Sequence, residues 1–254
     1  MDYRDKFYKK YASSHTANLY DSEVNTLKGI RQQFFVWKDY FGKFLPIDKS
    51  ISILEIGCGN GGFVYWLHEL GYSNSCGIDI SEEQVGLAKK QGIINVEVAG
   101  LVEFLNSKKD KFDIIFARDV IEHFNKLELL EILELVFASL KSGGKFIVKT
   151  PNGESPFSGR YRFWDFTHEL SFTKASIWQL FSITGFKEIE VFSEGPVVHG
   201  VKSFVRFICW KLIELLLRFY LIAETGSGNG IFTQNLIAAG VKSKKPSPPN
   251  ESKV

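Results

Sequence analysis

A glycine-rich bend between a short apolar stretch and a helical pattern is the feature that most constrains the fold of this chain. Residues 51–56 read as a buried strand, glycines follow at 57, 59, 61 and 62, and residues 62–70 read as a helix ended by Gly71. Glycines let a backbone approach a ligand closely, and the helix N-terminus adds oriented N–H donors. The bend therefore predicts a site for a nucleotide-like ligand.

Strands and helices alternate through much of the chain. Further strands are predicted at residues 76–80, 93–98, 112–117, 144–149, 187–192 and 231–239, and helices at 23–44, 81–91, 127–140 and 174–184. This order gives right-handed crossovers and an α/β fold with a doubly wound, mostly parallel sheet and helices on both faces. In such sheets ligands bind beyond the carboxyl ends of the strands, so residues just after each strand matter most.

The expected organisation is an N-terminal helical cap at 1–45, one main domain at 46–241 and a disordered tail at 242–254. Within the domain, residues 195–230 form an insertion with a long apolar stretch at 201–222 that carries several charges. Because these charges point in opposite directions around a helix, one uniform helix is not expected. A break, or two faces covered by protein, is favoured instead. The stretch could form an added layer over a pocket, a homodimer contact, a peripheral membrane contact or plain core.

Charge, cysteines and hydropathy exclude several classes of protein. The 31 basic and 29 acidic side chains leave a net charge of +2, too balanced for a protein that neutralises a nucleic-acid backbone. The three cysteines are an odd number without the spacing of a zinc or redox site, so no metal is predicted. The N-terminus lacks the apolar core of a secretory signal, and no uncharged stretch is long enough to span a bilayer. We therefore expect a cytoplasmic protein, with contact at the inner face of the membrane as an open alternative.

The glycine motif is accompanied by four further motifs in the order and spacing of one enzyme family. The segments are Glu55–Gly61, Gly77–Ile80, Phe112–Ile115 with Asp119–His123, Leu140–Gly144, and Thr150–Asn152. In these segments the chain resembles the class I methyltransferases that use S-adenosyl-L-methionine. The resemblance implies a Rossmann-like seven-stranded sheet with an antiparallel last strand and, here, a helical insertion between strands six and seven.

The resemblance also implies which residues meet the cofactor. The glycine loop would face its methionine part, and the carboxylate of Asp79 its ribose hydroxyls. After the third strand, where the family often has an acid, the chain has an uncharged segment, so contact with the adenine falls to the backbone or to Glu103. The predicted cofactor-binding residues are Glu55, Gly57, Cys58, Gly59, Gly61, Asp79, Ile80, Gly100, Leu101 and Asp119.

A loop after the fifth strand supplies the candidate residues for the methyl acceptor. His168 is the first candidate for the base that takes a hydroxyl proton, because its pKa normally lies near neutrality, with Asp165 or Glu169 as its orienting partner. His123, after the fourth strand, is a further candidate catalytic residue, and Arg160, Arg162, Trp164 and His199 are candidate substrate-binding residues. The alternatives are that His168 only fastens the loop, that the two arginines form a solvated loop face, that His123 only caps the following helix and that His199 lies in a turn.

The segments 165–173, 196–200, 224–226 and 233–236 resemble a branch of methyltransferases associated with bacterial surface polysaccharide biosynthesis. This likeness implies O-methylation of a sugar or glycan carried on a nucleotide or lipid. A methyltransferase of quinones or other lipid-like molecules is the alternative. More remote alternatives are an NAD-dependent oxidoreductase, since Gly57, Gly59 and Gly62 also satisfy GxGxxG, a scaffolding subunit, and a metal-dependent variant that uses Asp119, Glu122 and His123.

Overall fold

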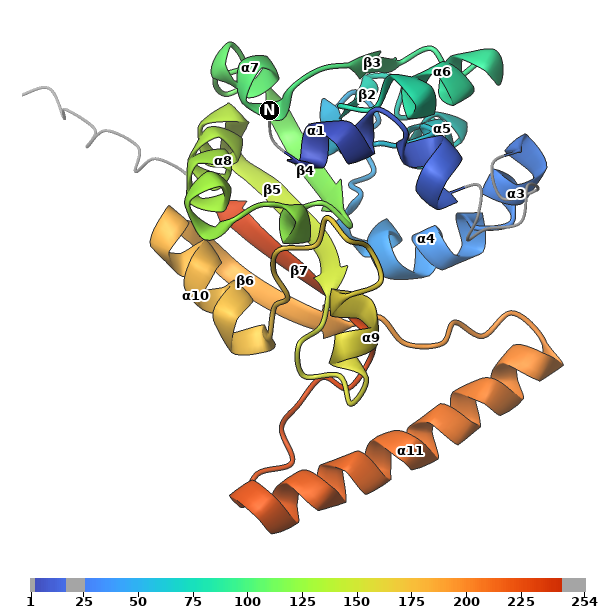
Figure 1. Ribbon diagram of the computed structural model, residues 1–254, viewed down its shortest axis with the longest axis vertical. Helices are drawn as coiled ribbons and strands as arrows, with labels where there is room; N and C mark the ends of the chain where they lie inside the picture. Colours follow the sequence, from blue (N-terminus) through green and yellow to red (C-terminus); the bar gives the residue numbers. More distant parts are fainter. Residues whose placement is uncertain (1–2, 17–25, 244–254) are drawn as a thin grey trace, which may run out of the picture.

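One seven-stranded sheet organises the molecule, with its strands in the order β3-β2-β1-β4-β5-β7-β6 (Figure 1). The computed structural model describes residues 3–16 and 26–243. The strands are β1 (Ile53–Ile56), β2 (Ser75–Asp79), β3 (Val96–Val98), β4 (Phe112–Arg118), β5 (Leu140–Pro151), β6 (Phe186–Ser193) and β7 (Asn235–Lys242). Strands β1 to β5 pair in parallel, whereas β7 runs antiparallel to both β5 and β6. The predicted fold class is confirmed.

Helices cover both faces of this sheet. They are α1 (Tyr3–Tyr8), the π-helix η1 (Ala12–Thr16), α3 (Leu27–Arg31), α4 (Phe34–Phe41), the 3-10 helix η3 (Gly42–Phe44), α5 (Gly62–Glu69), α6 (Glu82–Lys90), α7 (Leu101–Asn106), the 3-10 helix η4 (Ile121–His123), α8 (Lys126–Ser139), α9 (Ser158–Arg162), α10 (Lys174–Thr184) and α11 (Val201–Thr225). Helix α6 begins as predicted, because the Ser81 hydroxyl accepts a hydrogen bond from the Gln84 N–H.

Two hydrophobic clusters lie on opposite faces of the sheet. Successive side chains of β4 alternate between them: Ile115 and Ala117 belong to the cluster under α8 and α10, and Ile114 and Phe116 to the cluster under α4 and α5. Both faces of the strand are therefore buried, which explains why its sequence reads as a continuous apolar run. The central strands are held rigid from both sides, and their carboxyl ends provide a fixed platform.

Three predicted element boundaries were wrong. The helix expected over 23–44 is divided into α3 and α4 by a turn at Gln32 and Gln33, and its first three residues lie outside the described residues. The turn expected at 142–144 is part of β5, which already pairs with β4 at Leu140. Residues 231–234 precede β7 instead of opening it, because the Asn152 amide binds the carbonyls of Ile231 and Thr233. In the last two cases a contact distant in sequence set the boundary.

Helix α11 corrects the prediction for the insertion. It is one unbroken helix of 25 residues, of which only Ser203 is buried, so neither a break nor a core position is present. On one side of the helix Glu214 pairs with Lys211 and Arg218, and Arg218 also donates to the Gly228 carbonyl, while Lys202 and Arg206 on the other side are exposed. No described helix has the length and hydropathy required to cross a membrane. The division into cap, domain and tail stays a prediction, and residues 244–254 of the tail lie outside the described part.

Candidate active site

A cavity of about 390 Å³ opens at the carboxyl ends of β1, β2 and β4. This volume falls in the usual range for small-molecule sites, and it lies where α/β sheets bind ligands. Its lining includes several residues predicted for the cofactor or for catalysis, namely Gly57, Gly59, Asp79, Ile80, Gly100, Leu101, Asp119 and His123. Glu103, an alternative contact for the adenine, also lines it. The strand ends therefore bring the predicted residues together.

The glycine loop is shaped by left-handed backbone conformations. Gly57 has a φ of +66°, and a Cβ added to it would lie 2.3 Å from a methyl carbon of Val120. Gly61 caps α5 with a φ of +72°, and a Cβ there would lie 2.9 Å from a methyl carbon of Ile93. Both positions therefore require glycine, Gly57 at the cavity and Gly61 behind it.

Asp79 connects the glycine loop to the next helix. Its Oδ2 accepts a hydrogen bond of 2.8 Å from the Gly59 N–H, and its Oδ1 accepts one of 2.8 Å from the Ser81 N–H. A carboxylate has further acceptor positions, and those of Asp79 lie at the cavity wall. Burial raises the pKa of this carboxyl, while the two N–H donors oppose the shift. Asp79 can thus accept hydrogen bonds from a pair of hydroxyls while it fixes the loop.

Glu55 and Cys58 lie beneath the cavity and do not line it. Glu55 is fully buried, and its Oε1 accepts hydrogen bonds from Arg118, the shorter of which is 2.7 Å. Burial raises the pKa of Glu55 to about 7, although Arg118 opposes this shift. Cys58 is buried against Gly77, where an added Cβ would lie 2.6 Å from the Cys58 Cβ. Both residues support the loop from below.

A chain of hydrogen bonds orients His123, whose ring lines the cavity. The Thr167 hydroxyl donates to Asp165 Oδ1 over 2.7 Å, so it accepts from His123 Nδ1, which lies 2.8 Å away. Tyr11 donates its hydroxyl to the other oxygen of Asp165 over 2.6 Å. Because Nδ1 of His123 carries the proton, its Nε2 keeps a free lone pair. Asp165 therefore acts on His123 through Thr167, a different partner from the predicted His168.

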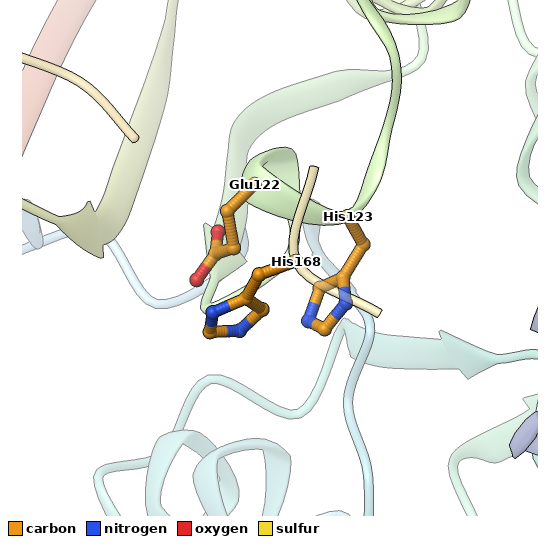
Figure 2. A group of neighbouring side chains, drawn as sticks. All are labelled: Glu122, His123 and His168. Carbon is orange, nitrogen blue, oxygen red and sulfur yellow. The ribbon is translucent and has the colours of Figure 1, made fainter. Parts of the chain in front are cut away.

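His168 and Glu122 lie beside His123 (Figure 2). The centres of the two imidazole rings are 4.7 Å apart, and His168 Nδ1 lies 3.0 Å from the Tyr161 carbonyl, to which it donates. Burial lowers the pKa of His123 to about 4 and also lowers that of His168, so both rings are neutral at pH 7. Burial raises the pKa of Glu122 to about 8.

These three side chains could also hold a metal ion. One ligand atom from each of Glu122, His123 and His168 lies within 4.8 Å of the other two, and Figure 2 shows the side chains gathered in one place. Glu122 Oε2 accepts from the Thr150 hydroxyl, whereas the buried Oε1 has no hydrogen-bond partner among the described residues. Two imidazoles and a carboxylate match the preferences of several divalent cations. The set overlaps the predicted Asp119, Glu122 and His123 but contains His168 in place of Asp119.

Asp119 is held at the cavity by the half-buried Lys149. It has a φ of +56°, its N–H donates to the Lys149 carbonyl, and Lys149 Nζ donates to its Oδ2 over 2.8 Å. Lys149 also lies 3.6 Å from Glu194, and the two carboxylates raise its pKa. An uncommon left-handed conformation at a non-glycine residue is thus stabilised from both backbone and side chain.

The sequence of this site and its geometry match one enzyme family. A family described as a methyltransferase domain matches residues 30–191 of this chain, a range that runs from α3 into β6. The chain belongs to this family. The predicted methyltransferase with S-adenosylmethionine as its methyl donor is thereby confirmed, and the NAD-dependent alternative is set aside.

Individual relatives share about 30% sequence identity with this methyltransferase over part of its length. A mitochondrial ubiquinone biosynthesis O-methyltransferase from Rattus norvegicus is 28% identical over 185 residues, which cover 59% of this chain and 51% of the rat protein. A tRNA U34 carboxymethyltransferase from Desulfotalea psychrophila is 32% identical over 123 residues, covering 46% and 38%. The chain therefore spans about half, or less, of the length of these relatives.

The solved structures agree on the fold. A methyltransferase from Archaeoglobus fulgidus, described as dependent on S-adenosylmethionine, superimposes with a TM-score of 0.62 at 21% sequence identity. The superposition covers 85% of this chain and 97% of the archaeal chain. At this identity the likeness supports the same architecture and says nothing about the acceptor.

The residues at the cavity fit S-adenosylmethionine. Asp79 offers carboxylate acceptors at the wall, Gly57 and Gly59 expose backbone without side chains, and apolar side chains such as Leu101 and Phe124 complete the lining. A ligand with a hydroxyl-bearing sugar and a flat base needs this combination of acceptors and apolar surface. The methyltransferase therefore presents a suitable site at its strand ends.

The predicted acceptor residues lie outside this cavity. Arg162 donates to the carbonyls of His168 and Glu169, so it fastens the loop. The guanidinium of Arg160 lies 5.6 Å from the ring centre of Trp164, which is 39% exposed. His199 is exposed and packs against Phe35, with ring centres 4.2 Å apart. None of these four predicted residues is among those that line the cavity.

Two cavity residues, Tyr8 and Tyr11, escaped the sequence reasoning. They come from the N-terminal segment and line the same cavity as Gly57 and Gly59 of the glycine loop. Arg4 attaches α1 by hydrogen bonds to Glu128 and to the His123 carbonyl. The signal was present in the spacing: aromatic residues at 3, 7, 8 and 11 recur at intervals of three and four, as on one side of a helix. The segment was instead interpreted as lacking a period.

Proposed function

We propose that this methyltransferase transfers a methyl group to a hydroxyl of an aromatic, lipid-like small molecule such as a reduced quinone. The observation that carries the proposal is the similarity to the rat ubiquinone biosynthesis O-methyltransferase, which extends over 185 residues. The apolar lining of the cavity, with Tyr8, Tyr11 and Phe124 at its wall, supports an aromatic acceptor.

This proposal reverses the order of the two predicted acceptors. A sugar or glycan was the first choice from the sequence, and neither of the two named relatives is described as acting on a sugar. Arg160 and Trp164, predicted as substrate-binding residues, are not among the residues that line the cavity. A nucleic-acid acceptor, as in the name of the tRNA enzyme, has less support because the net charge of the chain is only +2.

We propose the following roles for the residues of the site. Asp79 holds the ribose hydroxyls of S-adenosylmethionine, and the glycine loop lies against its methionine part. When bound, this donor supplies a methyl group on a positively charged sulfur. Displacement in line requires the acceptor oxygen to be aligned and deprotonated.

His123 is the proposed base for that proton. Among the two neighbouring imidazoles it is the one that lines the cavity, and its Nε2 is free while Thr167 and Asp165 fix the ring. Geometry comes before pKa in selecting a base, because hydrogen-bonding reach to the substrate is indispensable. His168, the first candidate from the sequence, packs behind His123 as its neighbour.

A direct experiment compares acceptors at equal concentration. Purified protein is incubated with radiolabelled S-adenosylmethionine and either a short-chain prenylated catechol or a panel of nucleotide sugars. Labelled methyl ether is expected on the catechol. Transfer to a sugar alone would restore the first prediction, and absence of S-adenosylhomocysteine binding by calorimetry would overturn the cofactor assignment itself.

A divalent cation at Glu122, His123 and His168 is a second candidate arrangement, favoured by the unpartnered Glu122 Oε1 and the converging ligand atoms. The proposed metal-independent reaction predicts unchanged turnover after dialysis against EDTA. Loss of activity with recovery on adding magnesium, manganese or zinc would replace the base mechanism with a metal-assisted one.

Location and assembly stay predictions. The sequence predicts a cytoplasmic protein, and it leaves open a homodimer or a peripheral membrane contact through residues 201–222. Neither alternative depends on which acceptor is methylated.

A further inference from the structure

Helix α11 carries a row of exposed apolar side chains along one side. Figure 1 shows the helix as an outlying rod, connected by extended segments to β6 and β7. Along one side, apolar residues alternate at spacings of four and three, and each is between 43% and 81% exposed. We call these residues the outward stripe: Val201, Val205, Ile208, Leu212, Leu215, Phe219 and Ile222.

The charges of the helix lie away from this stripe. At about 100° per residue, Glu214 and Arg218 fall on the opposite side, where they pair with each other and Arg218 reaches the Gly228 carbonyl. The side that faces the protein also carries the half-buried Phe207, Trp210 and Leu221, so the helix has apolar side chains on both sides and only the outward ones lack a cover among the described residues. Exposure of such a continuous patch, about 30 Å long, is costly unless something covers it.

The apolar surface is wider than a contact between two helices. Further exposed apolar residues flank the outward stripe on both sides, namely Phe204, Ile213, Leu216 and Tyr220. Apolar side chains therefore occupy roughly half of the helix circumference, whereas a paired coiled coil uses a narrow seam. A face of this width is typical of helices that lie in the plane of a membrane surface.

The residues that border this face are mainly basic. Lys202 and Arg206 are exposed on one side and Lys211 on the other, while Glu214 is neutralised by two cations. The remaining acidic residue, Glu224, is at the C-terminal end of the helix. Basic residues beside an apolar face complement the negative charge of anionic lipid headgroups.

We propose that the outward stripe of α11 docks on a membrane surface that contains anionic lipid. The helix lies on the side of the sheet toward which β4 and β5 run, as does the loop that carries α9 (Figure 1). Phe157 and Phe163 of that loop are 69% and 77% exposed, and they add apolar surface on the same side. Docking therefore turns the carboxyl edge of the sheet toward the bilayer. This inference stands apart from the proposed acceptor, because binding to lipid requires no turnover.

The decisive experiment measures co-sedimentation with vesicles of phosphatidylcholine alone or with phosphatidylserine added. The native protein is expected to sediment with the anionic vesicles. The double variant Leu212→Glu/Leu216→Glu is expected to lose this binding, because charged side chains disfavour insertion. Its control is Ile47→Glu/Leu127→Glu, which makes the same kind of change at exposed residues outside α11 (97% and 80% exposed) and should bind normally. Calorimetric binding of S-adenosylhomocysteine verifies that each variant is folded.

A second variant tests whether the basic residues beside the outward stripe contribute to lipid binding. Lys202→Gln/Arg206→Gln is expected to bind anionic vesicles about tenfold more weakly, and added salt should weaken the native protein in the same direction. No sedimentation of the native protein, or normal binding by the Leu212→Glu/Leu216→Glu variant, would overturn the proposal. A dimer detected by sedimentation velocity without lipid would also overturn the proposal, provided that Leu212→Glu/Leu216→Glu abolishes the dimer and that vesicles do not dissociate it. That result would assign the face to a second copy of the chain.

Discussion

The two sides of the site are built by different means. On the proposed cofactor side, Gly57 and Gly59 follow β1 and Asp79 ends β2, and their positions are set by backbone conformation and by bonds to backbone N–H groups. On the acceptor side, His123 is positioned by Thr167 and Asp165, which belong to a loop about 44 residues further along, and by Tyr11 from the N-terminus. The comparison shows that the cofactor side is determined locally and the acceptor side by side chains that converge from distant segments.

The largest effect is expected from His123→Ala, which removes the proposed base and leaves the cofactor side intact. Turnover should fall by about 10²- to 10⁴-fold, while the dissociation constant of S-adenosylhomocysteine changes little. Steady-state kinetics and calorimetry measure the two quantities. His168→Ala is the matched control and should lose less activity. If His168→Ala is the more damaging change, the base assignment returns to His168.

Next in size is Asp79→Asn, which weakens the cofactor side alone. An amide cannot accept hydrogen bonds with both of its terminal groups, so the affinity for S-adenosylhomocysteine should fall about hundredfold. Asp113→Asn, a change at the amino end of β4, provides the comparison and should bind normally. Equal loss in both variants would indicate general destabilisation instead of a contact with the ligand.

A smaller effect on turnover is expected from a change in the hydrogen bonds that position His123 on the acceptor side. Thr167→Val removes the hydroxyl between His123 and Asp165 while it retains the volume of the side chain. Turnover should decrease about tenfold with no change in cofactor affinity, because the imidazole loses its fixed tautomer and orientation. A decrease in cofactor affinity of the same size would contradict the proposed independence of the two sides.

The smallest predicted effect concerns Glu55 beneath the glycine loop. Burial raises its pKa to about 7 from an ordinary value near 4.5, so the folded protein binds a proton more tightly than the unfolded chain. This contribution to stability is present below pH 4.5 and is lost as the pH rises toward 7. Relative to Glu55→Gln, the native protein should therefore lose unfolding free energy across that interval, as chemical denaturation at several pH values can test. A constant difference would mean that Glu55 stays ionised.

Much of the fold and of the cofactor side could be predicted because the relevant signals are local. A strand, a bend and a helix follow one another within a few residues, and Asp79 is the last residue of the next strand. It was harder to predict from the sequence which residues of the motif face the cavity. Glu55 and Cys58 belong to the motif but point beneath it, since successive residues of a strand and its bend face different sides.

The acceptor side could be predicted only in part. His123 and Asp165 were identified, but the link through Thr167 depends on a loop folding back over η4, where the Glu169 and Leu170 N–H groups donate to the Glu122 carbonyl. Tyr11 lies 154 residues from Asp165 in the chain, and no local pattern reports such a contact. Helix α11 was mispredicted because charges on opposite sides were taken to exclude one uniform helix, whereas Arg218 finds its partners in Glu214 and in the loop that follows.

The position of β7 has a consequence for the order in which the molecule can form. Among the described strands β6 pairs only with β7, yet β7 follows both β6 and α11 in the chain and so leaves the ribosome after them. Strand β6 and helix α11 are therefore synthesised before the strand that attaches them to β5 exists. Until Asn235–Lys242 emerges, β5 is the edge of a five-stranded intermediate. A chain that stops before residue 235 should lose both outer strands together, and with them the anchorage of α11.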